Sequence, residues 1–135
     1  MNSFLYPYAG LATILGLIIY IVLAARVGRA RMKYGVLAPA ITGHPEFERR
    51  FRVQSNTVEQ LVLFLPALWL CAVIVSDFWA GIGGIIWCLG RIIYAATYQP
   101  DTRGRFPGFA LTVLPSLTMM GASAWILIRD ITVTL

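Results

Sequence analysis

Polar side chains that could bind a small charged molecule recur at helical spacing in two parts of the sequence. The first set has the spacing i, i+4 and i+7 and consists of Arg52, Asn56 and Glu59. The second set has the spacing i, i+3 and i+7 and consists of Arg91, Tyr94 and Tyr98. Each set falls on one face of a helix. Guanidiniums bind carboxylates, a carboxylate binds an amine, and hydroxyl and amide groups bind a peptide, so these side chains suit a small zwitterionic ligand.

The elements that position these side chains are predicted to be membrane helices. Of the 135 residues, 59% are hydrophobic and 13% are charged, a composition typical of membrane proteins. Because a helix needs about 20 mostly apolar residues to span a bilayer, the sequence predicts an all-α, four-transmembrane-helix bundle. It forms one membrane domain over residues 1–135, with helices over about 8–25, 46–76, 78–98 and 106–128. The first segment lacks the basic start of a signal peptide and is interpreted as a retained helix.

Counting along the predicted spans places two charged residues inside the hydrocarbon. Glu59 lies just inside its basic-side edge, and Arg91 lies seven positions, roughly 10 Å, deeper than Tyr98. A charge at that depth costs about 2.5–3.5 kcal/mol, so Arg91 is expected to face a partner or a hydrated cavity. A Glu59–Arg91 ion pair that only joins two helices is the structural alternative.

Several other classes of protein are excluded. The net charge of +5 does not indicate nucleic-acid binding, because the basic residues lie in short segments between apolar runs. Cys71 and Cys88 lie within apolar runs and are interpreted as buried hydrophobic residues, not as a disulfide or a metal site. His44 is the only histidine, which excludes a centre built on several histidines, and it is interpreted as a loop residue without a role. No metal is expected.

The segment 42–59 resembles the signature of the MAPEG family, the membrane-associated proteins in eicosanoid and glutathione metabolism. The core of that signature is a Glu-Arg pair followed, at the family's spacing, by Arg52, Asn56 and Glu59. A second stretch, residues 91–105, is similar to the family's third helix and the loop after it. The resemblance in layout covers the whole chain and is strongest from residue 42 to residue 69.

The resemblance implies a homotrimer that binds glutathione, a co-substrate, between neighbouring subunits near the basic face. The positions it assigns to glutathione binding from one subunit are Arg52, Gln54, Asn56 and Glu59. The positions that also line or border this site are Arg31, Arg91, Tyr94 and Tyr98. The implied catalytic residue is Arg105, which activates the thiol of a glutathione held mainly by another subunit, and Arg103 is the alternative. Gln60 departs from the family, since many members have a tyrosine there that contacts the ligand.

The activity implied by the resemblance is that of a glutathione transferase or peroxidase of the lipid phase. The sulfur comes from glutathione, and the second substrate is a lipophilic electrophile or hydroperoxide that arrives from the membrane lipid. A non-catalytic membrane scaffold that binds lipid or glutathione is the alternative within the family. A small transporter is less consistent with the sequence, because such a protein is expected to carry a membrane-embedded acid and the first predicted helix has no charge.

The basic residues predict how an integral, multi-pass protein is oriented. Ten of the eleven Lys and Arg residues belong to the two connections on one side or to helix ends that reach it, and Arg129 alone lies opposite. Positive residues in short loops stay in the cytoplasm, so both termini are expected on the other side, across the inner membrane if the cell is bacterial. The residues interpreted as topology determinants that extend to lipid headgroups are Arg26, Arg29, Lys33, Arg49 and Arg50.

This orientation predicts that a reporter fused after Leu135 lies outside the cytoplasm. A pair of reporters, one active only in the cytoplasm and one active only outside it, measures the location directly. Activity of the cytoplasmic reporter alone would reverse the topology and move the basic connections to the other side of the membrane.

Overall fold

The computed structural model describes residues 5–98 and 102–134, except for the side chains of Thr102 and Arg103, and these residues form four α-helices. The helices are α1 (Pro7–Tyr34), α2 (Pro45–Ile74), α3 (Asp77–Thr97) and α4 (Thr102–Thr134). Each contains an apolar window long enough to cross a membrane. Large apolar side chains are exposed along the helices, as expected for a protein whose surroundings are lipid. The predicted all-α, four-helix membrane fold is confirmed.

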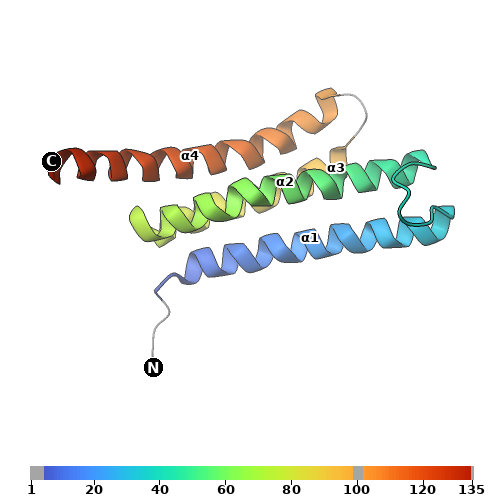
Figure 1. Ribbon diagram of the computed structural model, residues 1–135, viewed down its shortest axis with the longest axis horizontal. Helices are drawn as coiled ribbons and strands as arrows, with labels where there is room; N and C mark the ends of the chain where they lie inside the picture. Colours follow the sequence, from blue (N-terminus) through green and yellow to red (C-terminus); the bar gives the residue numbers. More distant parts are fainter. Residues whose placement is uncertain (1–4, 99–101, 135) are drawn as a thin grey trace.

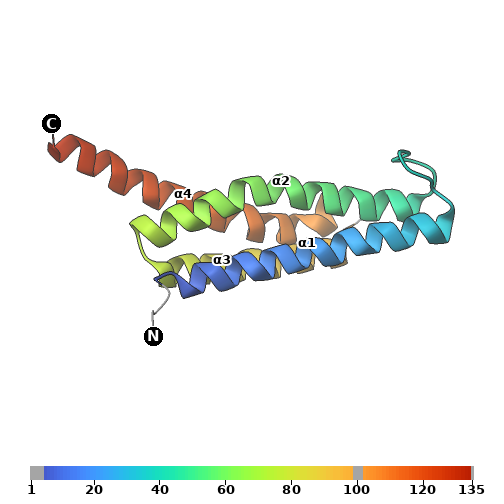
Figure 2. The same cartoon turned by 60° about the horizontal axis from the view of Figure 1, so that its bottom comes forward.

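The helices run up and down, with α2 and α3 in the middle and α1 and α4 on opposite sides of them (Figure 1). Both described ends of the chain lie at one end of the bundle. The α1–α2 connection lies at the other end, together with the end of α3 and the start of α4 (Figures 1 and 2). The C-terminal half of α4 diverges from the other helices (Figure 2). The two basic segments of the sequence therefore lie at one end of the bundle.

Two helices extend further than the sequence analysis predicted. The prediction for α1 was 8–25, but the helix continues through the basic residues to Tyr34 and ends at Gly35, whose φ of 66° is left-handed. The prediction for the last helix was 106–128, whereas α4 covers Thr102–Thr134. A hydropathy pattern marks where the hydrocarbon ends, but a helix ends only where its backbone meets a breaker or a cap. The helix of α1 therefore carries its arginines beyond the hydrocarbon on a rigid element.

His44 has a structural role, contrary to the prediction that it has none. It is the N-cap residue of α2, and its Nδ1 accepts a hydrogen bond of 3.2 Å from the backbone N–H of Glu46. Its ring also stacks on Tyr34, with 3.8 Å between the ring centroids. Because Tyr34 is the last residue of α1, this contact joins the end of α1 to the start of α2.

Glycines allow α3 to pack closely against both of its outer neighbours. A Cβ at Gly81 would lie 2.6 Å from Tyr8 Cβ, and one at Gly84 would overlap the side chain of Ala12, both on α1. On the α4 side, a Cβ at Gly90 would lie 2.7 Å from Leu111 Cβ. Small residues at these crossings permit close contact between helices within the membrane.

The core between the helices is apolar. Phe64 of α2 stacks on Trp87 of α3 with 4.2 Å between centroids, and both side chains are fully buried. Cys71 and Cys88 are buried and free, which confirms their interpretation as small hydrophobic residues.

Asp77, the first residue of α3, caps the N-terminus of α1. Its carboxylate accepts hydrogen bonds from the backbone N–H groups of Tyr8 at 3.0 Å and Ala9 at 2.8 Å. The first N–H groups of a helix have no partner within that helix and carry a partial positive charge, so an external carboxylate satisfies both needs. This contact sets the axial position of α1 against α3.

We predict that Asp77→Ala destabilises the protein by about 1–2 kcal/mol, the usual loss when a helix cap is removed. Unfolding in mixed detergent micelles, followed by circular dichroism, measures the difference. Asp130→Ala is the matched control, because among the described residues the Asp130 carboxylate pairs with its exposed neighbour Arg129 alone and such pairs contribute little. Equal stability of wild type and Asp77→Ala would show that the cap does not hold α1 in place.

Candidate functional site

Arg91 and Asn56 join α3 to α2 in the half of the bundle near the basic end. Arg91 is fully buried, and its Nη1 donates a hydrogen bond of 3.1 Å to Asn56 Oδ1. Its guanidinium carbon lies 4.2 Å from the centroid of the Tyr94 ring, one turn further along α3. The sequence predicted that Arg91, deep in the membrane, faces a partner, and this partner is the side-chain amide of Asn56. Among the described residues Arg91 makes no ion pair with Glu59.

The remaining donors of Arg91 are unsatisfied. Its Nε and Nη2 atoms are buried and have no hydrogen-bond partner in the described part of the chain. A buried donor without a partner costs about 1–3 kcal/mol, and more when it is charged. These two N–H-bearing atoms therefore favour an acceptor that the isolated chain does not supply, such as water or an anionic group of a ligand.

Arg105 and Tyr98 join α4 to the end of α3. Arg105 Nη1 donates a hydrogen bond of 3.3 Å to Tyr98 Oη, and its guanidinium carbon lies 5.4 Å from the centroid of the Tyr98 ring. Tyr98 in turn packs edge-on against Tyr94, with 5.4 Å between centroids. The first turns of α4 approach α3 this closely because Gly108 lies directly against the backbone of Tyr94. A glycine in α4 thus places Arg105 beside the tyrosines.

A cavity of about 330 Å³ lies between α2, α3 and α4 at this point. Its lining residues are Asn56, Tyr94, Arg105, Phe106 and Phe109. Amide, hydroxyl and guanidinium groups provide polar contacts, and the two phenylalanines provide an apolar wall on the α4 side. The sequence analysis did not identify Phe106 and Phe109. Their i, i+3 spacing directly after Arg105 is a signal, although any apolar helix contains such pairs.

Arg52 and Glu59 lie on the exposed surface of α2 and do not line this cavity. They share a helical stripe with Asn56, as their spacing predicted. Among the described residues neither side chain forms a salt bridge. Both charges are therefore available to a ligand that extends from the cavity along α2.

Arg31 and Gln54 lie on the α1 side of the subunit. Arg31 Nη1 donates to the carbonyl oxygens of Ala40 at 2.7 Å and Val36 at 3.3 Å, both in the α1–α2 connection. Gln54 Nε2 contacts Tyr20 Oη on α1 at 3.5 Å. Residues 54 and 56 differ by about 200° around a helix, so Gln54 cannot share a direction with Asn56. A single subunit does not bring Arg31 and Gln54 to the cavity.

The structure brings five of the sequence-predicted site residues together within one subunit: Asn56, Arg91, Tyr94, Tyr98 and Arg105. The sequence analysis predicted that Arg105 acts on a glutathione held mainly by another subunit, and within one subunit Arg105 and Asn56 line the same cavity. The side chain of Arg103, the alternative to Arg105, lies outside the described part of the chain. Gln60, where the sequence departs from the resemblance, has a buried Oε1 without a partner in the described residues.

Comparison with known proteins agrees with the resemblance found in the sequence. The family model for MAPEG matches residues 9–125. An uncharacterized protein of Synechocystis is 49% identical over 88% of this chain and 85% of its own length. Human microsomal glutathione S-transferase 2 is 41% identical over 73% of this chain and 69% of its own. Bovine leukotriene C4 synthase is 31% identical over 83% of this chain and 78% of its own.

The match to the family model spans all four helices, including the α2 residues Arg52, Asn56 and Glu59 and the α3–α4 residues that meet at the cavity. The chain, an all-helical membrane protein with a polar cavity between α2, α3 and α4, therefore belongs to the MAPEG family.

Proposed function

We propose that this protein is a membrane-embedded glutathione transferase that activates the glutathione thiol for attack on a lipophilic electrophile or hydroperoxide. At the family level, the relatives named as glutathione transferase and leukotriene C4 synthase support a glutathione-conjugating activity. The observation that carries the finer proposal is the pairing of Arg105 with Tyr98 beside a cavity that also contains Asn56 and Tyr94. The cationic group of Arg105 is held there by a neutral partner, and among the described residues no carboxylate forms a salt bridge with it.

Arg105 is assigned the role of stabilising the thiolate. A thiol with a pKa of ~8.5 is only about 3% thiolate at pH 7, and the thiolate is the reactive form. Lowering that pKa by about two units requires ~2.7 kcal/mol of preferential stabilisation of the anion. A guanidinium has five N–H donors, and Tyr98 uses only one nitrogen of Arg105. The others can donate to sulfur in a half-buried site, where a charge-assisted bond supplies energy of this order.

The polar inventory of the site fits the rest of glutathione. Glu59 is assigned to the ammonium group and Arg52 to a carboxylate, because both are exposed charges that flank Asn56 of the cavity on the α2 stripe. The free donors of Arg91, which lies against Tyr94 of the cavity wall, favour a further anionic or carbonyl oxygen. The amide of Asn56 and the hydroxyl of Tyr94 can bond peptide groups.

A homotrimer would complete the site. Arg31 and Gln54 are assigned to the same ligand but lie on the α1 side of the subunit, away from the cavity. A rotationally symmetric assembly brings one face of a subunit against a different face of the next. We therefore propose that the α1-side residues of one subunit meet the cavity of its neighbour, with glutathione bound between them.

The second substrate enters from the bilayer. Phe106 and Phe109 line one wall of the cavity, and further along α4 an apolar groove of about 500 Å³ separates α4 from α3. Such a groove suits the lipophilic part of an electrophile. Conjugation joins the sulfur to an electrophilic carbon, and the thiol proton passes to the leaving group or to water. Reduction of a hydroperoxide consumes two glutathione molecules and yields an alcohol, water and glutathione disulfide.

We predict that Arg105→Ala lowers kcat by about 10²-fold or more, equivalent to ~2.7 kcal/mol, with a much smaller change in KM. The reason is that Arg105 stabilises charge on sulfur, which matters more for the chemical step than for binding. Turnover of glutathione with a generic aryl halide measures kcat, and the thiolate absorbance of bound glutathione should fall in parallel.

Arg103→Ala is the matched control, because it removes the same charge from the same turn of α4. Its effect on kcat and on the thiolate absorbance is expected to be mild. Loss of the thiolate signal in Arg103→Ala with an intact signal in Arg105→Ala would transfer the catalytic role to Arg103. A protein that binds glutathione but produces no thiolate and no turnover would instead be a binding scaffold.

Mixed oligomers test whether two subunits build each site. Gln54→Ala and Arg105→Ala subunits, each expected to be weakly active alone, are coexpressed with different affinity tags and purified as mixed assemblies. If the site lies between the subunits of a homotrimer, each mixed assembly contains two subunits of one variant and one of the other. One of its three interfaces then has both residues intact, and activity recovers to roughly a third of the wild-type value. Activity no higher than that of the two separate variants would place the whole site within one subunit.

A further inference from the structure

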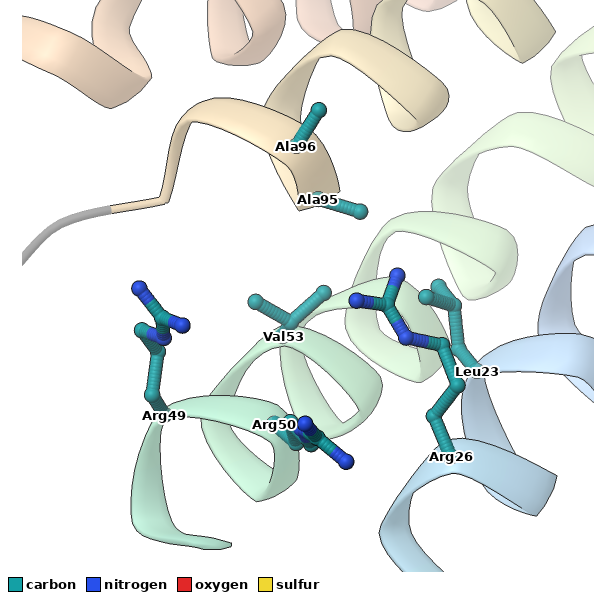
Figure 3. A pocket seen from close by; sticks show the side chains of 7 residues that line it. All are labelled: Leu23, Arg26, Arg49, Arg50, Val53, Ala95 and Ala96. Carbon is teal, nitrogen blue, oxygen red and sulfur yellow. The ribbon is translucent and has the colours of Figure 1, made fainter. Parts of the chain in front are cut away.

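Three arginines meet in a second pocket, on the other side of α3 from the candidate glutathione site. Arg26 extends from α1, and Arg49 and Arg50 from α2, around a cavity of about 90 Å³ (Figure 3). Ala95 and Ala96, at the end of α3, form part of its apolar wall. This pocket shares no lining residue with the cavity beside Arg105.

The charge of this three-arginine pocket is only partly balanced. Arg49 Nη2 forms a salt bridge of 2.8 Å with Glu46 on the same helix. Among the described residues, Arg26 and Arg50 have no salt-bridge partner and donate no hydrogen bond to another protein group. No carboxylate of the described residues lines the pocket. Guanidiniums that line one pocket without an acid between them create a site for an anion, and their planar donor sets match the oxygens of a phosphate.

An apolar groove adjoins this pocket. A cavity of about 330 Å³ between α1 and α3 shares four lining residues with it, namely Leu23, Arg26, Ala95 and Ala96. From there the groove follows the exposed apolar side chains Ile18, Val22 and Ile92 along the two helices into the hydrophobic part of the bundle, and the buried Arg91 of α3 also lines it. A ligand that filled both spaces would have an anionic end and an apolar chain.

The depth of the three-arginine pocket in the membrane fits a ligand with an anionic end and an apolar chain. Arg26 is the first charged residue after the uncharged segment 1–25, so the pocket lies where the hydrocarbon ends and the headgroups begin. We propose that the three-arginine pocket and the α1–α3 groove together bind one anionic phospholipid. Its phosphate lies between Arg26 and Arg50, Arg49 contributes a further donor, and an acyl chain occupies the groove.

This site differs from general attraction to an acidic membrane. Each basic residue near an anionic surface contributes about a fivefold gain in binding, whatever its direction. Guanidiniums on several sides of one pocket can each make a charge-assisted hydrogen bond to the same phosphate, and the loss of such a bond costs about tenfold or more. The two cases are separated by comparing arginines that line the pocket with one that does not.

The experiment titrates the full-length protein in neutral detergent with phosphatidylglycerol or phosphatidylcholine of the same acyl chains. Native mass spectrometry measures the first bound lipid. Phosphatidylglycerol is expected to bind at least about tenfold more tightly. Arg26→Gln and Arg50→Gln should each remove about tenfold of that affinity. Arg29→Gln is the matched control, since Arg29 is exposed on α1 outside the pocket, and it should lose about fivefold at most.

Ala96→Trp provides a variant that changes no charge. Ala96 is exposed at the junction of pocket and groove, so an indole there should block the acyl chain while the arginines remain. Phosphatidylglycerol binding should fall, and competition by inorganic phosphate should be weak in the wild type. Equal losses in Arg29→Gln and Arg26→Gln, or no preference for phosphatidylglycerol, would overturn the proposal. Equal occupancy by free phosphate or glutathione, or full lipid binding by Ala96→Trp, would also overturn it.

Discussion

A charged side chain in the hydrocarbon of a bilayer needs a hydrogen-bonding partner or water, and Arg91 is fully buried within α3. Its bond to Asn56 supplies a neutral partner and requires that face of α2 to point at α3. Tyr94 and Tyr98 follow Arg91 at i+3 and i+7, so the same rotation of α3 directs both rings toward the space beside α4. The placement of one buried guanidinium thus determines which side chains meet at the candidate site.

Close packing around α3 makes this arrangement possible. Gly84 of α3 lets α1 pack closely on one side. On the other side, Gly90 of α3 and Gly108 of α4 let α3 and α4 pack closely. Within lipid, helices gain little by burying apolar surface, so short backbone distances and satisfied polar groups decide how they associate. Asp77 adds a polar contact of this kind at the far end, where it caps α1. As the central element, α3 therefore contributes a wall to the glutathione cavity on one side and to the three-arginine pocket on the other.

The basic residues, which at first indicate only topology, divide into groups with different surroundings. Arg31 bonds to carbonyls of the α1–α2 connection, Arg105 bonds to Tyr98, and Arg26 faces a pocket that contains two further arginines. Each group lies near the same end of the bundle, so all of them can contribute to orientation. Their side chains, however, point in different directions around the helices. Arg31 holds the α1–α2 connection, Arg105 is proposed to act in the chemical step, and Arg26 is proposed to bind a lipid.

The sequence by itself determined the four spans, the membrane class, the polar stripes of the second and third helices and the need of Arg91 for a partner. These features follow from composition, length and helical periodicity, which a single chain displays directly. Only the tertiary structure decided that the partner is Asn56 rather than Glu59, that Gln54 turns toward α1, and that Arg26 meets arginines of α2. The helix ends beyond the hydrocarbon and the capping role of Asp77 also emerged only there. Periodicity defines a face of one helix, but which faces meet depends on the rotation and close approach of whole helices. Those are set by glycine contacts and polar pairs between residues far apart in the chain.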